Sequence, residues 1–370
     1  MDKKLSLFSG NRTKHSPALN RTWIAILSGF LASILFLCVS PVHAIEVSGL
    51  FEAEVPVTNQ SAASRKQAVI SALRIVLVKL TGDRNAPGRS ALSPVMAQAE
   101  SYMLQFRYRE NTSRSGPQAM NLWVQFDEDA LNEILRNYGI PVWGKERPSI
   151  LVWLASQGSA GRRLVNLEDN SGFLEILEKQ AQSRGVALIF PLFDLQDSSY
   201  LKASDIWGGF REPVILASRR YHADVILTGS IKQVIPSVWE ARWTVYIDGQ
   251  PANWTTQGDL PDVVLDEGID GLVDILANRY ANAGGYVQEN MVEISVSDIF
   301  NLDQYARALK YLESLNSVTG VYVKRAEPGK VTFQVRAHGG EVVVAQSIAL
   351  GRILESISSG SRNSYRLLRK

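Results

Sequence analysis

The sequence predicts an α+β protein of three small modules that follow an N-terminal leader. Three observations predict this class. Strand-like alternation is followed by helical periodicity in the first part of the chain, short buried strands alternate with helices in the middle, and the last part has the order β-α-β-β-α-β. We place the leader at residues 1–44 and the modules at residues 45–146, 147–284 and 290–370.

The leader has the three parts of a secretory signal peptide. A basic start precedes an uncharged apolar run of 17 residues, Trp23 to Val39, and small residues stand at Val42 and Ala44. We therefore expect cleavage after Ala44 and export to the periplasm. The alternative is an uncleaved inner-membrane anchor at residues 23–40, because a run of this length is at the lower limit for crossing a bilayer.

Loss of the leader changes the charge balance. Five of the 39 Lys and Arg and one of the 37 Asp and Glu lie in the leader, which leaves 34 basic and 36 acidic side chains. A slightly acidic chain argues against a nucleic-acid partner. The single cysteine, Cys38, also lies in the leader, so disulfides, thiolate zinc sites and a cysteine nucleophile are excluded. Only His222 and His338 remain of the histidines, and we expect no metal site and no cofactor.

The first module is predicted to have the order β-α-α-β-β-α. A half-buried strand begins it, and Ser61 or Ser64 can cap a helix whose apolar residues recur at helical spacing from Val69 to Leu80. Ser93-Pro94 begins a second helix. Two strands and a helix capped by Asp127 complete the module.

The turn "LTGDR" at the end of the first helix has two interpretations. Glycine beside a basic residue is typical of a phosphate-binding turn, but a P-loop needs a second glycine and then Lys and Ser or Thr at the start of a helix. Here the helical periodicity comes before Gly82. We therefore predict that Gly82 ends the helix in the left-handed conformation and that Lys79 suits the negative end of the helix dipole.

The second module is predicted to be a mixed sheet flanked by helices. Buried strands at "SILVWLA", "VALIFPLF" and "ADVILTGSI" alternate with helices at residues 172–184 and 212–221. The segments "WEARWTVYID" and "ANWTTQG", separated by "GQP", indicate an aromatic hairpin, and a helix at residues 261–280 closes the module.

The third module has the element order of a ferredoxin-like fold. Strands are expected at residues 291–296, 318–324 and 330–337, with a last strand at "YRLLRK". Helices are expected at residues 302–315 and 341–357.

Five side chains are candidates for ligand binding, and none is predicted to be catalytic, because no nucleophile motif is present. Asp194 and Asp197 follow a buried strand, at the edge where open α/β sheets bind ligands, or else they cap turns or the next helix. Arg220 either contacts an anion or lies on a solvated face. Trp239 and Trp243 of the hairpin either bind a sugar or a partner protein or pack on a helix.

Two stretches, "VSGLFEAEVPV…SRKQAVISALRIVLVKLTGDR" and "RYHADVILTGSI…WEARWTVYIDGQPANW", resemble a secreted gammaproteobacterial family known as domain of unknown function 2066. The resemblance covers nearly the whole mature chain and implies no activity. The first strand and its Ala-rich helix are similar to the N-terminal module of flagellar assembly protein T. "ADVILTGSI" and the hairpin are similar to the N-terminal domains of TolB and the curli secretion protein G. These likenesses imply protein contacts in envelope assemblies.

The sequence therefore predicts a non-enzymatic periplasmic protein, a structural or adaptor component of a cell-envelope assembly whose partners are envelope proteins. Membrane contact is expected only through an uncleaved leader. Two alternatives stay open. One is a periplasmic small-molecule or glycan binding protein with a cleft near Asp194 or the tryptophan hairpin. The other is a hydrolase that uses the carboxylates of Asp194 and Glu212.

Overall fold

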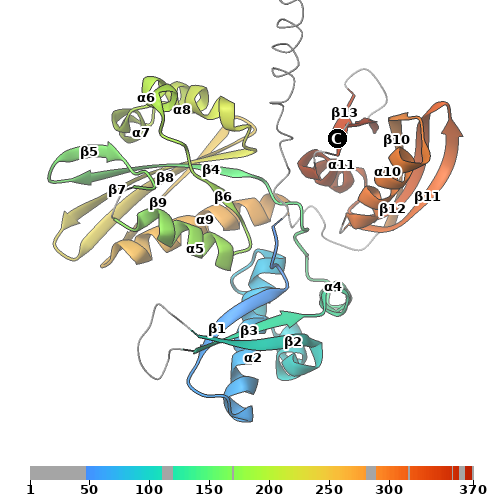
Figure 1. Cartoon of the computed structure of the whole chain (residues 1–370), viewed down its shortest axis with the longest axis horizontal. Helices are drawn as coiled ribbons and strands as arrows, with labels where there is room; N and C mark the ends of the chain where they lie inside the picture. Colours follow the sequence, from blue (N-terminus) through green and yellow to red (C-terminus); the bar gives the residue numbers. More distant parts are fainter. Residues whose placement is uncertain are drawn as a thin grey trace, which may run out of the picture. The chain divides into compact units, whose positions relative to one another are not determined.

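The computed structural model describes residues 47–110, 120–168, 171–280, 289–315, 317–351, 353–357 and 363–368. The predicted leader lies outside these ranges. The predicted α+β class is confirmed, because the described residues form three sheets, each accompanied by helices (Figure 1). Within the described ranges, no helix has both the length and the apolar character needed to cross a membrane.

The N-terminal module is a three-stranded antiparallel sheet with a long helix, α2, across one face (Figure 1). In the sheet, β3 lies between β1 and β2. The chain order is β-α-α-β-β-α, as predicted, although the second helix is short and is flanked by 3₁₀ turns. The elements are β1 (Glu52–Val57), α2 (Ala62–Thr81), η1 (Ala86–Gly88), η2 (Ser90–Leu92), α3 (Ser93–Ala97), η3 (Ala99–Tyr102), β2 (Met103–Glu110), β3 (Met120–Phe126) and α4 (Glu128–Asn137).

Both ends of α2 follow from local sequence. The Ser61 side chain accepts a hydrogen bond from the Ser64 N–H and caps the first turn. At the other end, Gly82 has the left-handed conformation (φ 69°) and donates its N–H to the carbonyl of Val78 at 2.8 Å, so the predicted cap is confirmed. The buried face of α2 packs on the sheet through Ala68, Val69, Ala72, Leu73, Val76, Leu77 and Leu80.

Lys79 makes different contacts from those that the helix-dipole argument predicts. Its ammonium donates to the carbonyls of Gly49 and Glu52 at 3.1 and 2.8 Å, at the beginning of the first strand. Burial lowers the pKa of Lys79 to about 8. The side chain therefore ties α2 to the start of the sheet.

The second module is a mixed sheet in the order β5-β4-β7-β8-β9, in which β4 and β7 are parallel and the short β6 also pairs with β4. Helices cover both faces, with α5 and α9 on one and α6, α7 and α8 on the other (Figure 1). The elements are β4 (Ile150–Gly158), β5 (Gly161–Leu164), α5 (Phe173–Ser183), β6 (Leu188–Ile189), α6 (Leu195–Tyr200), α7 (Ala203–Gly208), α8 (Arg211–Ser218), η4 (Arg219–Tyr221), β7 (Val225–Ile235), β8 (Val238–Ile247), β9 (Gln250–Gly258) and α9 (Pro261–Tyr280).

The sequence of β4 explains why helices cover two faces. Ile150 and Val152 belong to the core cluster with α5 and α9, whereas Leu151 and Trp153 belong to the cluster with α6, α7 and α8. Successive side chains of a strand point to opposite faces, so an apolar run without alternation needs cover on both sides.

The third module contains the predicted β-α-β-β-α-β order, including the last strand, with one additional strand between the second helix and that last strand. The helix expected to reach Ile357 ends at Gly351, and Leu354 instead pairs with Leu367 in an additional strand. Apolar spacing continues past the end of the helix, but strand pairing overrides it. The elements are β10 (Glu289–Ile299), α10 (Leu302–Ser314), β11 (Val318–Glu327), β12 (Gly329–His338), α11 (Gly340–Gly351), β13 (Leu354–Ser356) and β14 (Ser364–Leu367), in the sheet order β11-β12-β10-β14-β13.

Replacing Gly82 by alanine is expected to lower the free energy of unfolding by about 2–4 kcal/mol, from left-handed strain and overpacking together. An added Cβ would lie 2.4 Å from the Cβ of Ala277 and 3.1 Å from a ring carbon of Trp143. Urea unfolding measures the change. Gly88→Ala is the matched control, because nothing lies within 4 Å of its added Cβ. Equal stability of the two variants would contradict this description of the turn.

Candidate functional site

The carbonyl end of α2 is closed by groups from outside the N-terminal sheet. The Leu80 carbonyl accepts the N–H of Trp143 at 2.6 Å, and the Lys79 carbonyl accepts Nη2 of Arg147 at 2.8 Å. The Gly82 carbonyl accepts Nη2 of Arg184, which lies at the end of α5, at 2.9 Å. Since the last carbonyls of a helix have no partner within the helix, these contacts close the end of α2, and those of Arg147 and Arg184 join it to the second module.

Arg147 is a buried cation held by carbonyl groups. Besides the Lys79 carbonyl, it donates to those of Trp143 and Gly144, at 2.9 and 2.6 Å. Its guanidinium carbon lies 3.9 Å from the centre of the Trp143 ring. Burial lowers the pKa of Arg147 to about 9, so the guanidinium stays charged at neutral pH.

Two arginines and two aspartates make a second contact at the same place. Arg84, just after the Gly82 turn, binds Asp270 at 3.1 Å and Asp274 at 2.6 Å, one turn apart on α9. The buried Arg184 binds the same two carboxylates, Asp274 at 2.8 Å. Burial by itself would lower the pKa of Arg84, but the hydrogen bonds and charges of Asp274 and Asp270 raise it above its ordinary value. Each aspartate thus bridges the two modules.

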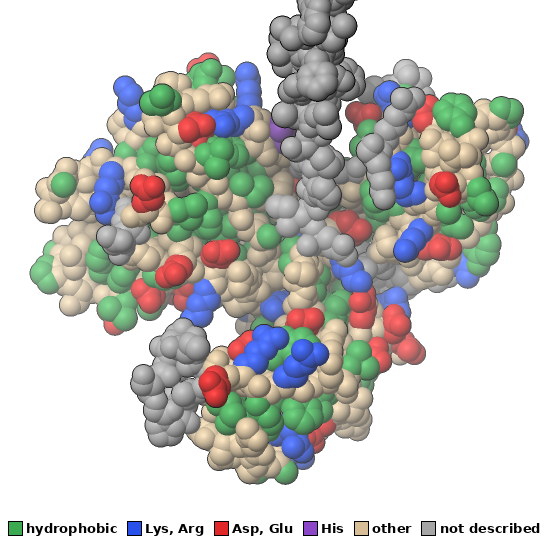
Figure 2. Space-filling view, viewed as in Figure 1, with side chains coloured by type: hydrophobic (Ala, Val, Ile, Leu, Met, Phe, Trp, Pro, Cys, Tyr) green, Lys and Arg blue, Asp and Glu red, His purple; other side chains and the backbone are tan. Residues whose placement is uncertain are grey.

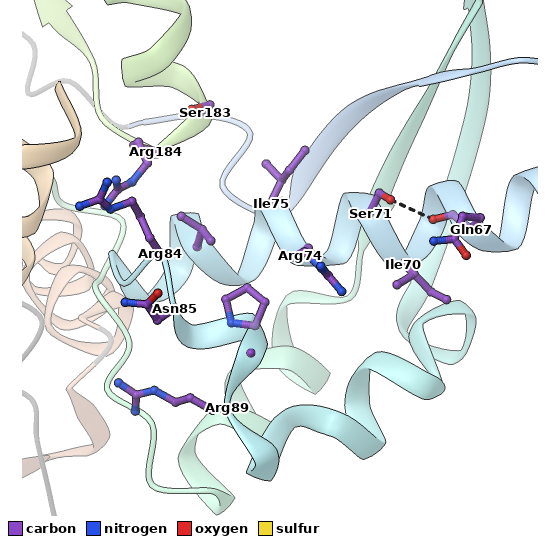
Figure 3. Close-up of a pocket in the computed structure, with 13 residues that line it drawn as sticks. Gln67, Ile70, Ser71, Arg74, Ile75, Arg84, Asn85, Arg89, Ser183 and Arg184 are labelled. Atoms are coloured by element: carbon purple, nitrogen blue, oxygen red, sulfur yellow. Dashed lines mark hydrogen bonds between the residues drawn. The ribbon is translucent and has the colours of Figure 1, made fainter. Parts of the chain in front are cut away.

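An open groove of about 960 Å³ runs along α2 beside this network (Figure 3). Figure 3 shows Arg84 and Arg184 next to each other at one end of the groove and Arg74 on α2. We call it the arginine groove. It is lined by Gln67, Ile70, Ser71, Arg74, Ile75 and Val78 of α2, by Arg84, Asn85, Pro87, Gly88 and Arg89 of the following turn, and by Ser183 and Arg184.

The arginines of the groove differ in what they bind. Arg84 and Arg184 are neutralised by the α9 aspartates, and Arg89 binds Asp83 at 2.7 Å. Arg74 is exposed, and within the described part of the chain it has no acidic partner. Beside it, the half-buried Ile75 and the neighbouring apolar side chains form the floor. The groove therefore offers one free cation over an apolar surface.

Three of the predicted ligand residues come together at the start of α6. Asp194 accepts the Asp197 N–H at 3.0 Å and so caps this helix, and both of its oxygens lie 2.8 Å from Nη1 of Arg220. Asp197 is 1% exposed and accepts the Tyr221 hydroxyl at 2.5 Å and the Phe193 N–H at 2.9 Å. The alternative role of Asp194 as a helix cap is thus observed. A role in ligand binding stays a prediction for this cluster.

Charge interactions set the protonation of the same cluster. The backbone N–H of Asp197, followed by the side chain of Arg220, lowers the pKa of Asp194. Burial, with the hydrogen bond to Asp197, raises the pKa of Tyr221 to about 12. At neutral pH the cluster therefore holds an ionised Asp194 beside a neutral phenol. Glu212, the proposed second carboxylate of a hydrolase, is exposed in the first turn of α8.

The two predicted tryptophans lie in or beside the core of the second module. Trp243 is 1% exposed, stacks on Trp254 with ring centres 6.3 Å apart, and donates its indole N–H to Thr256 at 3.0 Å. Trp239 is half-buried and meets the edge of Phe173. The hairpin packs on α9, which is the structural alternative given above. A ligand role for Trp239 and Trp243 stays a prediction.

The arginine groove was not predicted. Its sequence signal is a second, flanking stripe on α2, in which Ile70, Arg74 and Val78 follow one another at spacings of four residues. This flanking stripe lies next to the core-facing stripe of α2, so the sequence pattern alone does not distinguish the two. As for metal sites, the described residues contain no group of three or more His, Cys, Asp or Glu side chains placed to hold an ion.

Residues 44–144 match the family described as Domain of unknown function (DUF8605). This match spans the N-terminal module, whereas the predicted resemblance spans nearly the whole mature chain, and the predicted name, domain of unknown function 2066, is not confirmed. No match is found among curated proteins.

Three solved structures are similar to parts of the chain. The Protein Y N-terminal domain from Thermus thermophilus is 9% identical over 35% of this chain and 94% of its own, with a TM-score of 0.18. Lipoprotein GNA1162 from Neisseria meningitidis is 15% identical over 36% of this chain and 99% of its own, with a TM-score of 0.23. The LpoB C-terminal domain from Salmonella enterica is 17% identical over 35% of this chain and 90% of its own, with a TM-score of 0.21. At these scores the likenesses carry no argument about this chain's function.

Replacing Asp270 by asparagine is expected to lower the free energy of unfolding by about 2–4 kcal/mol, because it leaves a buried cation with one partner fewer. Arg184 is 3% exposed and would keep one carboxylate, Asp274, together with the Gly82 carbonyl. The control is Asp248→Asn, whose carboxylate is 71% exposed and pairs with Arg279. The Asp248→Asn variant should lose less than about 1 kcal/mol of the free energy of unfolding, because its ion pair is exposed to solvent. Thermal or urea unfolding of both variants measures the difference. Similar decreases in the free energy of unfolding would contradict the bridging role of Asp270.

Proposed function

We propose that this protein is a non-enzymatic adaptor of the cell envelope that binds an acidic segment of a partner protein in the arginine groove. The observation that carries the proposal is Arg74, a cation without an acidic partner in the described part of the chain, beside the apolar floor of an open groove. The predicted signal peptide supports a periplasmic location for this activity.

The chemistry of the groove favours a polypeptide segment with one acidic and several apolar side chains. The apolar floor contributes through burial, at roughly 25 cal/mol for each Å² removed from water. Arg74 adds charge complementarity, which selects the partner and its orientation more than it strengthens binding. Arg84 and Arg184, already paired with aspartates, shape one end of the groove and leave little free charge there.

The geometry favours binding over the hydrolase alternative. A general acid at neutral pH needs a raised pKa, whereas the pKa of Asp194 is lowered by the Asp197 N–H and Arg220. Both Asp194 oxygens are also engaged by the same guanidinium nitrogen. The arginine groove, in contrast, presents a side chain that is ready to form a new ion pair.

Photocrosslinking in the native periplasm tests the proposal. A photoreactive amino acid at Gln67, which lines the groove, is expected to form one discrete adduct with a partner protein. The neighbouring Lys66 is exposed but does not line the groove, so the same probe there is the matched control. Arg74→Glu should reduce the Gln67 adduct by about tenfold, the equivalent of 1.4 kcal/mol.

The control for charge reversal is Arg136→Glu, on the exposed face of α4 in the same module. It should leave the adduct unchanged. The proposal fails if position 66 gives the same adduct as position 67, or if Arg74→Glu has no more effect than Arg136→Glu.

A further inference from the structure

The outer edge of β2 is an open strand edge. β2 pairs with β3 on one side, and on the other no strand of the described ranges pairs with it. Its side chains are well exposed, 63% for Leu104 and 37% for Phe106. An edge strand presents unpaired N–H and C=O groups, which can pair with another chain.

The opposite edge of the same sheet is protected. β1 contains Pro56, which has no N–H to donate. β2 contains neither proline nor lysine, the residues that commonly block an edge. Its one irregularity is a register shift between Met103 and Gln105, at the start of the strand. From Gln105 onward the edge of β2 is regular, and it is long enough for a further strand to pair with it.

Two arginines of β2 lie on the sheet face that α2 does not cover. The guanidinium carbons of Arg107 and Arg109 lie 5.4 and 5.2 Å from the centre of the Trp123 ring on β3. Arg109 also binds Glu54 at 3.0 Å, whereas Arg107 has no acidic partner among the described residues. Figure 2 shows Lys and Arg side chains on this face of the module. The open edge is thus flanked by one guanidinium, that of Arg107, without an acidic partner in the described ranges, while Glu54 pairs with Arg109 and Glu52 accepts the Trp123 indole N–H.

We propose that the edge of β2 binds an extended acidic segment of a partner protein, which adds a fourth strand to the sheet. Main-chain hydrogen bonds would provide affinity, and alternate side chains would provide specificity. An acidic residue of the segment would face Arg107 on the open face. The next residue would point to the other face, beside Phe106, and is expected to be apolar.

Repulsion between arginines makes β2 of a second copy of this chain a poorer binding partner for the edge than an acidic segment. Pairing β2 with itself would bring the two arginines of one chain, Arg107 and Arg109, to the same sheet face as the two of the other. Like charges opposite each other on a sheet are destabilising. The site is also independent of the arginine groove, because it uses β2 and Arg107 instead of α2 and Arg74.

Hydrogen exchange of the mature chain with an added peptide tests this inference. The probe is an eight-residue peptide of alternating Glu and Val with blocked ends. Exchange at residues 103–110 should slow by about tenfold when nine-tenths of the protein is bound. Arg107→Glu should weaken binding by about three- to tenfold, while the thermal unfolding midpoint stays that of the wild type.

Three controls make the outcome decisive. Arg162→Glu, on edge strand β5 with its guanidinium 4.5 Å from the Trp207 ring, should keep the wild-type affinity. A Lys-Val peptide and a Glu-Val peptide N-methylated at alternate amides should not bind. The inference is overturned if β2 gains no protection, or if the methylated peptide binds equally well. It is also overturned if β2 becomes protected as the protein concentration rises without peptide, since a second copy would then be the occupant.

Discussion

The arrangement of the first two modules depends on the carbonyl end of α2. A helix end that is packed against another module needs donors for its free carbonyls. Here Trp143, Arg147 and Arg184 provide them, and all three lie beyond the N-terminal sheet in the chain. The left-handed Gly82 makes this possible, because it has no Cβ to keep Ala277 away from the turn.

This junction also determines the chemistry of the arginine groove. Two of the groove's arginines, Arg84 and Arg184, converge on Asp270 and Asp274 of α9 and are neutralised there. Arg74, two turns before the end of α2, has no acidic partner among the residues that the structure describes. A buried charge without an ion-pair partner destabilises the fold, whereas an exposed arginine is solvated by water and can pair with a carboxylate of another protein. Among the described residues that line the groove, the contacts that join the modules therefore leave Arg74 as the arginine free for recognition.

Local features of the sequence were enough to predict much of this fold. The Ser61 cap, the Gly82 cap and the hairpin that carries Trp243 depend on residues only a few positions apart. The same is true of Asp194 as the cap of α6. Periodicity misplaced the end of α11, because pairing between Leu354 and a strand more than ten residues away decides where that helix stops.

The functional geometry depends on contacts that no local pattern reveals. Arg184 and Asp274 are 90 residues apart in the chain, and Arg84 and Asp274 are 190 apart. Nothing in the turn "LTGDR" indicates that its arginine binds a helix of the following module. Likewise, the periodicity of α2 shows an apolar stripe but not which flank of it stays open to solvent. The arginine groove therefore emerges only from the fold.

The central claim is that the first two modules unfold as one unit through the end of α2. Native-state hydrogen exchange in low urea measures it directly, by comparing core amides of β3 with those of β7. The account predicts the same opening free energy and the same urea dependence for both strands. Opening of β3 at a distinctly lower free energy, while β7 stays protected, would contradict it.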